Sequence, residues 1–398
     1  MRSNDGVMTS RKRVLAAIRG LPVDRVPVMY WLNPHTTCRL LSEYRPGVNK
    51  TANFLARLLW GRFRRGGELD AGQWTRGLPL LFEEYGNQEY ALELGADVAI
   101  LSPALSRPTH MLRTLRRRNG RLSFVGPLGS LHGLGGIYAD VIQPAVKSIS
   151  DLAGYQLPPL REAHFAGIRR FRSRYPQACA LVEVMSFQQA LSDFIWRSDQ
   201  FMLALYDYPE EVHAFLKRLA DWVEVIIRMA IQAGADMVFL QDDYGSSGRP
   251  LISPKMWGTI TYPHLKRFID VAHEAGVPFM LHSCGYQTPF LEAYMEAGLD
   301  VLQSFQPKAG NDFKAAFEKY GDRLAFATGI DVQQGEWMRP QELRESILRS
   351  YQIGRRTGRH ILGMTHMMQY TMPMGNARTI FDTVREIQDK GENDACDP

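Results

Sequence analysis

A histidine and a cysteine two residues apart follow a short apolar run in the second half of this chain. The segment reads Val277-Pro278-Phe279-Met280-Leu281-His282-Ser283-Cys284-Gly285, which predicts a buried strand that ends in a loop at the glycine. Residues i and i+2 of a strand point to the same face, so we expect His282 and Cys284 to point the same way. An imidazole beside a thiolate forms half of a zinc site. The alternative is a packed histidine next to a buried thiol, so a metal site requires a third ligand from elsewhere.

Length and composition indicate a globular protein with a well-filled core. The chain has 398 residues, is 45% hydrophobic and carries 47 Lys and Arg against 42 Asp and Glu, a net charge of +5. This mild charge comes without a recognisable nucleic-acid-binding motif, so we expect no nucleic-acid partner. No apolar run reaches membrane-spanning length, and residues 1–13 lack the apolar core of a signal peptide. The four cysteines have no disulfide-framework spacing, so we expect a cytoplasmic protein.

Eight apolar runs alternate with amphipathic helical patterns along the chain, which predicts a closed parallel barrel of the (β/α)8 TIM type. The runs span residues 26–31, 98–101, 180–185, 237–241, 278–282, 301–305, 324–328 and 360–364. We expect one domain over 1–398, with an N-terminal helix within 1–22, a β-hairpin insertion at 110–136 after the second strand, and a disordered tail at 391–398. An open doubly wound sheet is the alternative, but no Gly-rich phosphate fingerprint follows the first strand.

Three of these runs are preceded by the same short sequence motif, in which a predicted helix ends at a glycine and an aspartate precedes the next strand. The motifs are Gly95-Ala96-Asp97, Gly234-Ala235-Asp236 and Gly298-Leu299-Asp300. A glycine in this position is typical of a helix C-terminus. The repetition therefore favours helices stacked outside a parallel sheet.

In a barrel of this type the chemistry lies at the carboxyl ends of the strands. His366 follows the eighth run and is the candidate third ligand beside His282 and Cys284. Three protein ligands with an open fourth position are typical of a catalytic zinc site, which could hold a substrate thiol as its nucleophilic thiolate. In the alternative interpretation His366 is a general acid or a hydrogen-bond donor, and Cys284 is a core thiol.

Other polar residues follow the remaining runs. Asp242 and Asp243 end the fourth and should face opposite ways, so that one points into the mouth while the other braces the loop. The carboxylate in the mouth could orient an acceptor, stabilise a cation or act as acid or base, whereas a turn cap is the alternative for one of the two. Further candidates for substrate binding, chosen by position, are Tyr30, His35, Glu183, Tyr244, Gln306 and Asp331.

With these residues in place, the chain resembles the uroporphyrinogen decarboxylase superfamily, a β/α-barrel group that includes cobalamin-dependent methyltransferases. The resemblance extends from about Thr9 to Ile387. The segments that carry it are 9–14, 22–27, 242–245, 250–254, 282–285, 306–307, 329–331 and 366–376.

The resemblance is nearer to the methyltransferase branch than to the true decarboxylases. The decarboxylases carry Arg-Gln-Ala-Gly-Arg after the first strand to hold an acidic tetrapyrrole, where this chain reads Trp31-Leu32-Asn33-Pro34-His35-Thr36. The methyltransferases bind zinc through His-x-Cys and commonly a second cysteine near the last strand. His282 and Cys284 match the first two ligands, and His366 stands in for the third.

This branch implies methyl transfer between a corrinoid on a small partner protein and a small-molecule acceptor, either a thiol or tetrahydrofolate. Zinc would assist, with Asp242 or Asp243 orienting the acceptor. One alternative is a metal-independent decarboxylase, in which Asp242 stabilises a protonated ring nitrogen and His366 donates a proton. Another is a corrinoid-binding module without catalysis. The residues leave the oligomeric state open, with a homodimer as one option.

Overall fold

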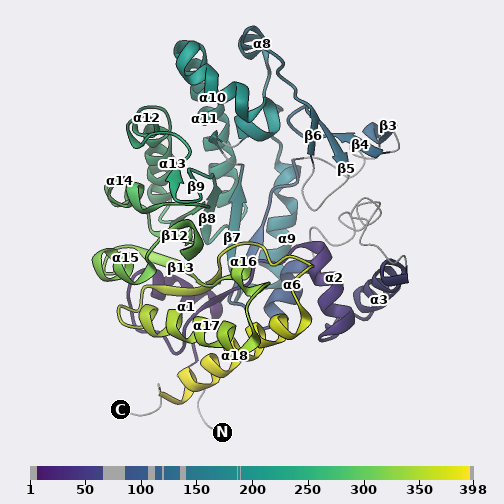
Figure 1. Cartoon of the computed structure of the whole chain (residues 1–398), viewed down its shortest axis with the longest axis vertical. Helices are drawn as coiled ribbons and strands as arrows, with labels where there is room; N and C mark the ends of the chain where they lie inside the picture. The colour runs from purple at the N-terminus through teal and green to yellow at the C-terminus, as the bar shows by residue number, and fades with distance from the viewer. Residues whose placement is uncertain are drawn as a thin grey trace.

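The computed structural model of the chain describes residues 7–65, 86–105, 113–118, 121–134, 140–185, 187–188 and 190–394. Its centre is an eight-stranded parallel sheet in the order β1-β14-β13-β12-β11-β8-β7-β2, surrounded by helices (Figure 1). The strands are β1 (Val28–Met29), β2 (Val98–Leu101), β7 (Cys179–Val184), β8 (Met237–Gln241), β11 (Phe279–Ser283), β12 (Val301–Ser304), β13 (Ala325–Ile330) and β14 (His360–Met364). All eight predicted runs are strands, and the predicted TIM-type barrel is confirmed.

Helices follow the strands and form the outer layer. The first three are α1 (Ser10–Ile18), α2 (Pro34–Glu43) and α3 (Lys50–Arg65), and the rest are α6 (Gly86–Glu93), α8 (Ile149–Gly154), α9 (Ala166–Arg174), α10 (Ser198–Asp207), α11 (Pro209–Gln232), α12 (Pro254–Ile260), α13 (Tyr262–Glu274), α14 (Leu291–Ala297), α15 (Phe313–Tyr320), α16 (Val332–Gly335), α17 (Pro340–Gly354) and α18 (Met374–Asp394). Short helical turns lie at η1 (Glu162–Phe165), η2 (Ala190–Ile195), η3 (Thr288–Phe290) and η4 (Pro307–Ala309).

Side chains that alternate along the strands divide the core into two clusters. On β8, Val238 and Leu240 pack outward in the cluster that contains the buried residues of α9 to α15. Met237 and Phe239 point inward and belong to the second cluster, which combines the barrel interior with buried residues of α1, α2, α6, α17 and α18. This alternation follows from the two-residue period of a strand. It also places Gln241, the next residue in the inward series, at the carboxyl end of the barrel.

The repeated aspartates fasten neighbouring strands at the amino end of the barrel. Asp97, Asp236 and Asp300 each accept a hydrogen bond from the backbone N–H at or beside the start of an adjacent strand: Val28 (2.9 Å), Ala180 (2.9 Å) and Phe279 (2.8 Å). Each aspartate therefore replaces a ladder hydrogen bond at a strand end, where backbone groups would otherwise lack partners.

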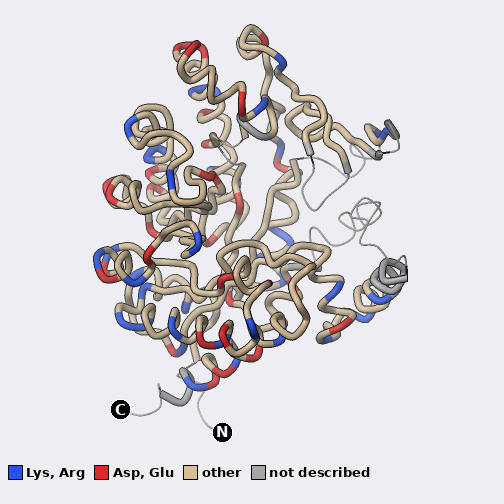
Figure 2. The backbone as a smooth tube through the Cα atoms, in the orientation of Figure 1, with Lys and Arg blue, Asp and Glu red and all other residues tan. Residues whose placement is uncertain are grey.

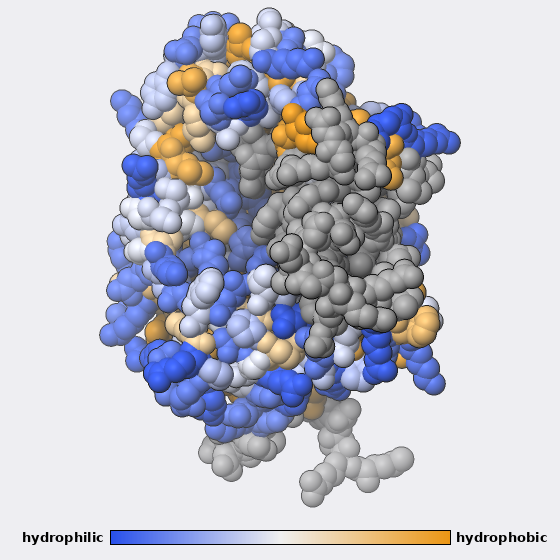
Figure 3. Space-filling view, turned by 45° about the vertical axis from the view of Figure 1, so that its right-hand side comes forward, coloured by the Kyte–Doolittle hydropathy of each residue, from blue (hydrophilic) through white to orange (hydrophobic). Residues whose placement is uncertain are grey.

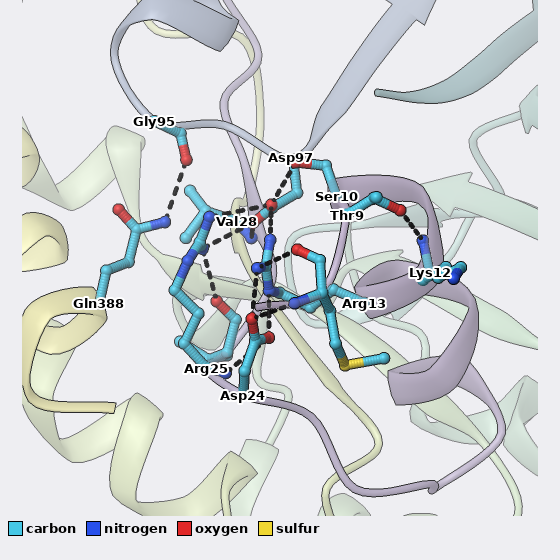
Figure 4. Close-up of polar contacts among 12 residues, drawn as sticks. Thr9, Ser10, Lys12, Arg13, Asp24, Arg25, Val28, Gly95, Asp97 and Gln388 are labelled. Atoms are coloured by element: carbon cyan, nitrogen blue, oxygen red, sulfur yellow. Dashed lines mark hydrogen bonds and ion pairs between the residues drawn. The ribbon is translucent and has the colours of Figure 1, made fainter. Parts of the chain in front are cut away.

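The gap between β1 and β2 is closed at this end by Asp97 and the N-terminal helix (Figure 4). The N–H of Asp97 donates to the carbonyl of Val28 at 2.8 Å. The Asp97 carboxylate also accepts hydrogen bonds from the side chains of Arg13 at 2.6 Å, Arg25 at 2.9 Å and Ser10 at 2.7 Å. Because Ser10 and Arg13 lie on α1, this helix becomes part of the closure.

An antiparallel sheet follows β2 and projects beside the barrel (Figure 1). Its strands are β3 (Arg116–Arg118), β4 (Arg121–Val125), β5 (Leu131–Leu134) and β6 (Asp140–Gln143). The predicted hairpin is present as β3 and β4, but the insertion continues to residue 143, so the predicted end at 136 is wrong. A two-stranded unit of β9 (Gly245–Ser246) and β10 (Arg249–Pro250) follows β8.

The C-terminal helix is longer than the sequence indicated. α18 extends to Asp394, so residues 391–394 of the tail that was expected to be disordered belong to this helix, while the remainder of that tail lies outside the described residues. The predicted N-terminal helix is present as α1, capped by the Thr9 hydroxyl, which accepts the N–H of Lys12 at 3.2 Å.

Charged residues lie mostly on the outer helices and loops (Figure 2). In the space-filling view, hydrophilic side chains cover most of the visible surface of the described residues, with small apolar areas toward the top (Figure 3). Among the described residues, no helix combines the length and apolar character needed to cross a membrane.

Candidate metal centre

The first two candidate ligands lie together at the carboxyl end of β11. His282 Nε2 is 3.3 Å from Cys284 Sγ. The ring of His282 is 3% exposed and points into the barrel, because it continues the inward series that begins at Met280. On its other side, His282 Nδ1 contacts the side-chain oxygen of Gln303 on β12.

The third candidate ligand reaches them from the loop after β14. One ligand atom each from His282, Cys284 and His366 lies within 4.8 Å of the other two. The two imidazole rings are 5.7 Å apart between centroids. His366, 82 or more positions away in the sequence, therefore meets His282 and Cys284 at the mouth of the barrel, although β14 lies three strands from β11 in the sheet.

The indole of Trp31 contacts the imidazole rings of both His282 and His366. It stacks on His366 with centroids 5.4 Å apart and an interplanar angle of 23°, and it meets His282 edge-on at 5.1 Å and 88°. Both arrangements are favourable for aromatic pairs. Trp31 follows the short strand β1, so one side chain from the first strand fixes rings from the fifth and the eighth.

The two adjacent aspartates after β8 separate as their alternation predicts. Asp243 points toward the cluster: its Oδ1 accepts the N–H of Cys284 at 2.7 Å and lies 3.6 Å from His282 Nε2. Asp242 is fully buried and accepts the N–H of Gln188 at 3.0 Å. Asp243 is therefore the aspartate that faces the mouth and Asp242 the one that braces the loop after β7, as the alternation predicted, and a catalytic role for either stays a prediction.

Two glycines allow the loops after β8 and β11 to touch through their backbones. A Cβ at Gly285 would lie 2.2 Å from the carbonyl carbon of Gly245, and one at Gly245 would lie 2.4 Å from the nitrogen of Tyr286. Gly285 also has φ +78°, a region that glycine enters without steric penalty. This close approach brings the carboxylate of Asp243 to the backbone of Cys284.

The turn after β12 presents two polar groups to the sulfur. Gln306 Nε2 donates to Cys284 Sγ at 3.6 Å, and the hydroxyl of Ser304 lies 3.9 Å from the same atom. Among described residues other than glycine, positive φ occurs at Ser304 (98°) and Phe305 (40°). Backbone strain of this kind is concentrated at functional sites, and here it directs Ser304 and Gln306 toward Cys284.

Burial sets the protonation of the three candidate ligands. It lowers the pKa of His366 to about 4, with a smaller contribution from the charge of His282. It also lowers the pKa of His282, although Asp243 and Gln303 act in the opposite direction. Burial raises the pKa of the Cys284 thiol, and the charge of Asp243 raises it further. Two neutral imidazoles and a thiol are thus held together, a donor set that a cation would complete by displacing the thiol proton.

Glu183 lies at the same end of the barrel, on β7. Its carboxylate accepts the hydroxyl of Ser102 at 3.0 Å. Burial raises the pKa of Glu183 to about 7, while hydrogen bonds from Ser102 and Gln241 act to lower it. The carboxyl group therefore changes its protonation near neutral pH.

Tyr30 and Tyr244 turn away from the mouth, so their expected position is wrong, whereas Asp331 follows β13 at the carboxyl end of the barrel, where its substrate-binding role stays a prediction. Tyr30 is buried on the outer side of β1, where its ring meets Phe381 at 5.1 Å. Tyr244 is fully buried and its ring meets that of Trp257 at 5.4 Å. Asp331 caps α16 by accepting the N–H groups of the next turn.

His35 lies in the first turn of α2, mostly buried. Its ring centroid is 6.1 Å from that of Tyr370, which belongs to the loop that also carries His366. A substrate-binding role for His35 stays a prediction.

Of the other candidate residues, Asp243 and Gln306 lie directly against the candidate ligands.

Sequence reasoning assigned no role to Trp31, Gln303 or Ser304. The inward series of β12, Val301 then Gln303, contained a signal for Gln303, because a polar residue inside a barrel strand requires a partner. The positive φ of Ser304 could not be predicted from the sequence, because a glycine would have indicated such a conformation and a serine does not.

A family model of uroporphyrinogen decarboxylase (URO-D) matches residues 141–387, well over half of the chain. The chain belongs to this family.

Related family members share low sequence identity with this chain. The uroporphyrinogen decarboxylase of Coxiella burnetii (strain RSA 493 / Nine Mile phase I) is 24% identical over 400 residues, which covers 96% of each protein. That of Crocosphaera subtropica (strain ATCC 51142 / BH68) is 25% identical over 185 residues, so the match spans about half of that relative's length, 49%. Among solved structures, a methyltransferase from Methanosarcina mazei superposes with a TM-score of 0.60 at 16% identity, covering 96% of this chain and 99% of that protein.

These comparisons confirm the superfamily that the motifs indicated. The superposition on the methyltransferase extends the likeness of fold to nearly the whole chain. The curated relatives are named decarboxylases and the solved structure of similar fold is named a methyltransferase, so the reaction of this chain has to be argued from its own residues.

Proposed function

We propose that this protein is a methyltransferase in which a zinc ion bound by His282, Cys284 and His366 assists the transfer of a methyl group between a corrinoid and a thiol or tetrahydrofolate acceptor. The observation that carries the proposal is the convergence of one ligand atom from each of these side chains within 4.8 Å.

The donor set and its spacing fit zinc. Zinc–nitrogen bonds of about 2.0 Å and zinc–sulfur bonds of about 2.3 Å place tetrahedral N and S donors roughly 3.5 Å apart. The separation of 3.3 Å between His282 Nε2 and Cys284 Sγ is close to this value. Three protein donors leave a fourth position for substrate, which is typical of catalytic zinc sites.

The surrounding residues have separate tasks in this proposal. When bound, zinc would supply the charge that keeps an acceptor thiol ionised at neutral pH. Trp31 and Phe239 cover the ring of His282 on its inner side and exclude water from it. The side chain of Asp243 is 30% exposed, so it can accept the proton of an acceptor S–H or N–H group, or orient that group.

The methyl donor that we propose is a methylcorrinoid carried by a small partner protein. The support for this donor is that the three candidate ligands meet at the barrel mouth and that the Methanosarcina mazei structure of similar fold bears the name methyltransferase. We propose a cytoplasmic location, and we retain a homodimer as an option for the assembly.

Uroporphyrinogen decarboxylation is less well supported by these side chains. Segment 31–36 occupies the place of the decarboxylase arginines, and its residues serve packing and capping instead: Trp31 stacks on His366, and Asn33 caps α2. A highly acidic tetrapyrrole would find no guanidinium in this segment, and unpaired buried carboxylates are costly. Asp242, which the decarboxylase alternative places on a ring nitrogen, is fully buried.

A metal assay tests the proposal. We expect about one zinc per purified chain, as a coordinated site retains its metal through purification. Cys284→Ala and His366→Ala should lose it, whereas Cys38→Ala, a buried cysteine on α2, and His213→Ala, an exposed histidine on α11, should retain it. Equal zinc content in all five proteins would contradict the assignment of the ligands.

The reaction is tested by mixing the zinc-loaded protein with methylcobalamin and either a panel of thiols or tetrahydrofolate, and by following the corrinoid absorbance. Demethylation that depends on the acceptor and disappears in Cys284→Ala supports methyl transfer. Corrinoid binding without demethylation would identify a binding module instead. Carbon dioxide release from a porphyrinogen by metal-free protein would identify a decarboxylase.

A further inference from the structure

Gln303 lies at the centre of the polar groups inside the barrel mouth. It belongs to the inward series of β12 and pairs in register with His282 on β11. Its side chain is fully buried. The inside of such a barrel is normally filled by apolar side chains, so a buried carboxamide in this position requires partners for both of its ends.

The two partners fix the orientation of the carboxamide. Its Nε2 donates to the carbonyl oxygen of Met364 at 2.8 Å. Since a carbonyl can only accept, the amino end of the side chain must face Met364. The oxygen Oε1 therefore faces His282 Nδ1, which is the other contact of this side chain.

The orientation of Gln303 in turn determines which nitrogen of His282 carries hydrogen. An amide oxygen only accepts, so Nδ1 must donate to it. In the neutral ring the other nitrogen, Nε2, then has a free lone pair. That atom lies 3.3 Å from Cys284 Sγ, on the side where the candidate ligands meet.

Gln303 also links the two segments that carry the candidate ligands. Met364 is the last residue of β14 and precedes His366 by two positions. The carboxamide thus extends from the ring of His282 past β13 to the end of β14. One side chain connects the fifth strand of the barrel with the loop after the eighth.

We propose that Gln303 is a positioning residue of the metal centre, which holds His282 as its Nδ1–H tautomer with Nε2 directed at the metal. The inference rests on the proposed metal site. It adds a residue that acts through His282 without contacting the metal or the substrate. Partners of this kind typically change metal affinity by roughly 10- to 100-fold when they are removed.

The tautomer can be read without any metal. Protein labelled with 15N-histidine gives the tautomer of each ring from long-range 1H–15N spectra, and the signal of His282 is assigned by its loss in His282→Asn. We expect the Nδ1–H form in the wild type and in Gln303→Glu, which keeps an oxygen facing Nδ1. In Gln303→Met, which has a similar shape but no acceptor, we expect a mixture of tautomers.

Zinc affinity, measured by competition with a chromogenic chelator, is the second readout. We expect Gln303→Met to weaken binding by about 10- to 100-fold. The matched control is Gln241→Met on β8, because Gln241 also pairs in register with His282 but from the opposite side, and it should bind zinc as the wild type does. Thermal melting of all variants excludes unfolding as the cause.

The two hypotheses fail separately. An unchanged tautomer and unchanged zinc affinity in Gln303→Met would overturn the role of Gln303 and leave the metal site standing. A wild-type protein that binds no zinc would overturn the proposed function. In that case the tautomer spectra still decide whether Gln303 orients His282, and a mixed tautomer in the wild type would refute it.

Discussion

Ser304 combines a strained backbone with a hydroxyl near the candidate ligand Cys284. Its φ of 98° places Cβ in a conformation that costs about 1–3 kcal/mol. The carbonyl of the same residue is held by the Thr328 hydroxyl at 2.8 Å. This hydrogen bond helps to maintain a conformation that the residue would not adopt alone, and the positions of the groups around the sulfur of Cys284 depend on that conformation.

We expect Ser304→Gly to raise the free energy of unfolding by about 1 kcal/mol, since glycine removes the strain. Ser304→Ala removes the hydroxyl but keeps Cβ, so it should give no such gain. Both variants lose the group near Cys284 and should bind zinc more weakly than the wild type. Urea denaturation and zinc competition measure the two effects. Equal stability of the glycine and alanine variants would show that the backbone is not strained.

Glu183 should make the stability of the protein depend on pH. Burial raises its pKa from 4.5 to about 7 in the folded state, so the folded protein binds this proton more tightly than the unfolded chain. The stabilisation is complete below about pH 4.5 and is lost as the pH rises through 7. Glu183→Gln removes the titration. We expect wild type to lose roughly 2 kcal/mol relative to this variant between pH 5 and pH 8.

The measurement is urea unfolding of both proteins at a series of pH values. Glu318→Gln on α15 is the control, because it removes the same charge from an exposed side chain, and its difference from wild type should stay small throughout. A constant difference between Glu183→Gln and wild type across this range would show that Glu183 is ionised in both states.

At the scale of the elements, the loops after β8 and β11 form one unit because Gly245 and Gly285 touch. Cys284 is presented from one side of this contact and Asp243 from the other, with 2.7 Å between the Cys284 nitrogen and the carboxylate. The position of Cys284 relative to the Asp243 carboxylate therefore depends on the absence of a Cβ atom at both Gly245 and Gly285.

Gly285→Ala should separate the two loops, since its Cβ would meet Gly245 backbone atoms at 2.2 and 2.3 Å. We expect a loss of several kcal/mol in unfolding free energy, together with weaker zinc binding. Gly276→Ala is the matched control: its φ is similar, +70°, but no atom lies within 4 Å of the added Cβ. It should lose only about 1–2 kcal/mol and keep its zinc. Equal losses in the two variants would mean that the close contact has no separate effect.

Several parts of this arrangement followed from sequence because they depend on one local rule. The period of two along a strand placed His282 and Cys284 on one face and separated Asp242 from Asp243. Counting eight buried runs placed His366 at the same end of the barrel. These inferences need only the order of the strands.

Other features of the site depend on how the strands are aligned and packed, which cannot be predicted from the local sequence pattern. Tyr244 differs from Asp243 by one position, and that single step turns its ring outward onto Trp257. Asp331 at a strand end looks the same in sequence whether it caps a helix or binds a ligand. The tasks of Trp31 and Gln303 follow only when β1 and β12 are aligned with β11.

In the whole molecule, the residues that stabilise the barrel and the residues that we propose bind the metal lie at opposite ends of the barrel. The amino end contains the repeated aspartates with their cations: Asp97 with Arg13 and Arg25, and Asp236 with Arg11 and Arg172. The carboxyl end contains the candidate ligands. Substitutions at the amino end should therefore change unfolding without altering the geometry of the metal centre.

We expect the loss of stability on Asp→Asn substitution to follow burial of the carboxylate, because removing one partner of a buried ion pair costs about 3–5 kcal/mol and an exposed pair contributes about 0–1 kcal/mol. The exposed fractions are 0% for Asp97, 1% for Asp236, 27% for Asp300 and 50% for Asp270, an exposed control on α13. Asp97→Asn and Asp236→Asn should lose most, Asp300→Asn less and Asp270→Asn least. Each folded variant should still bind zinc like wild type, measured by urea unfolding and chelator competition. Stability that falls equally in all four would refute the strand-fastening role of these aspartates, and zinc loss in folded Asp97→Asn would refute the separation of the two ends.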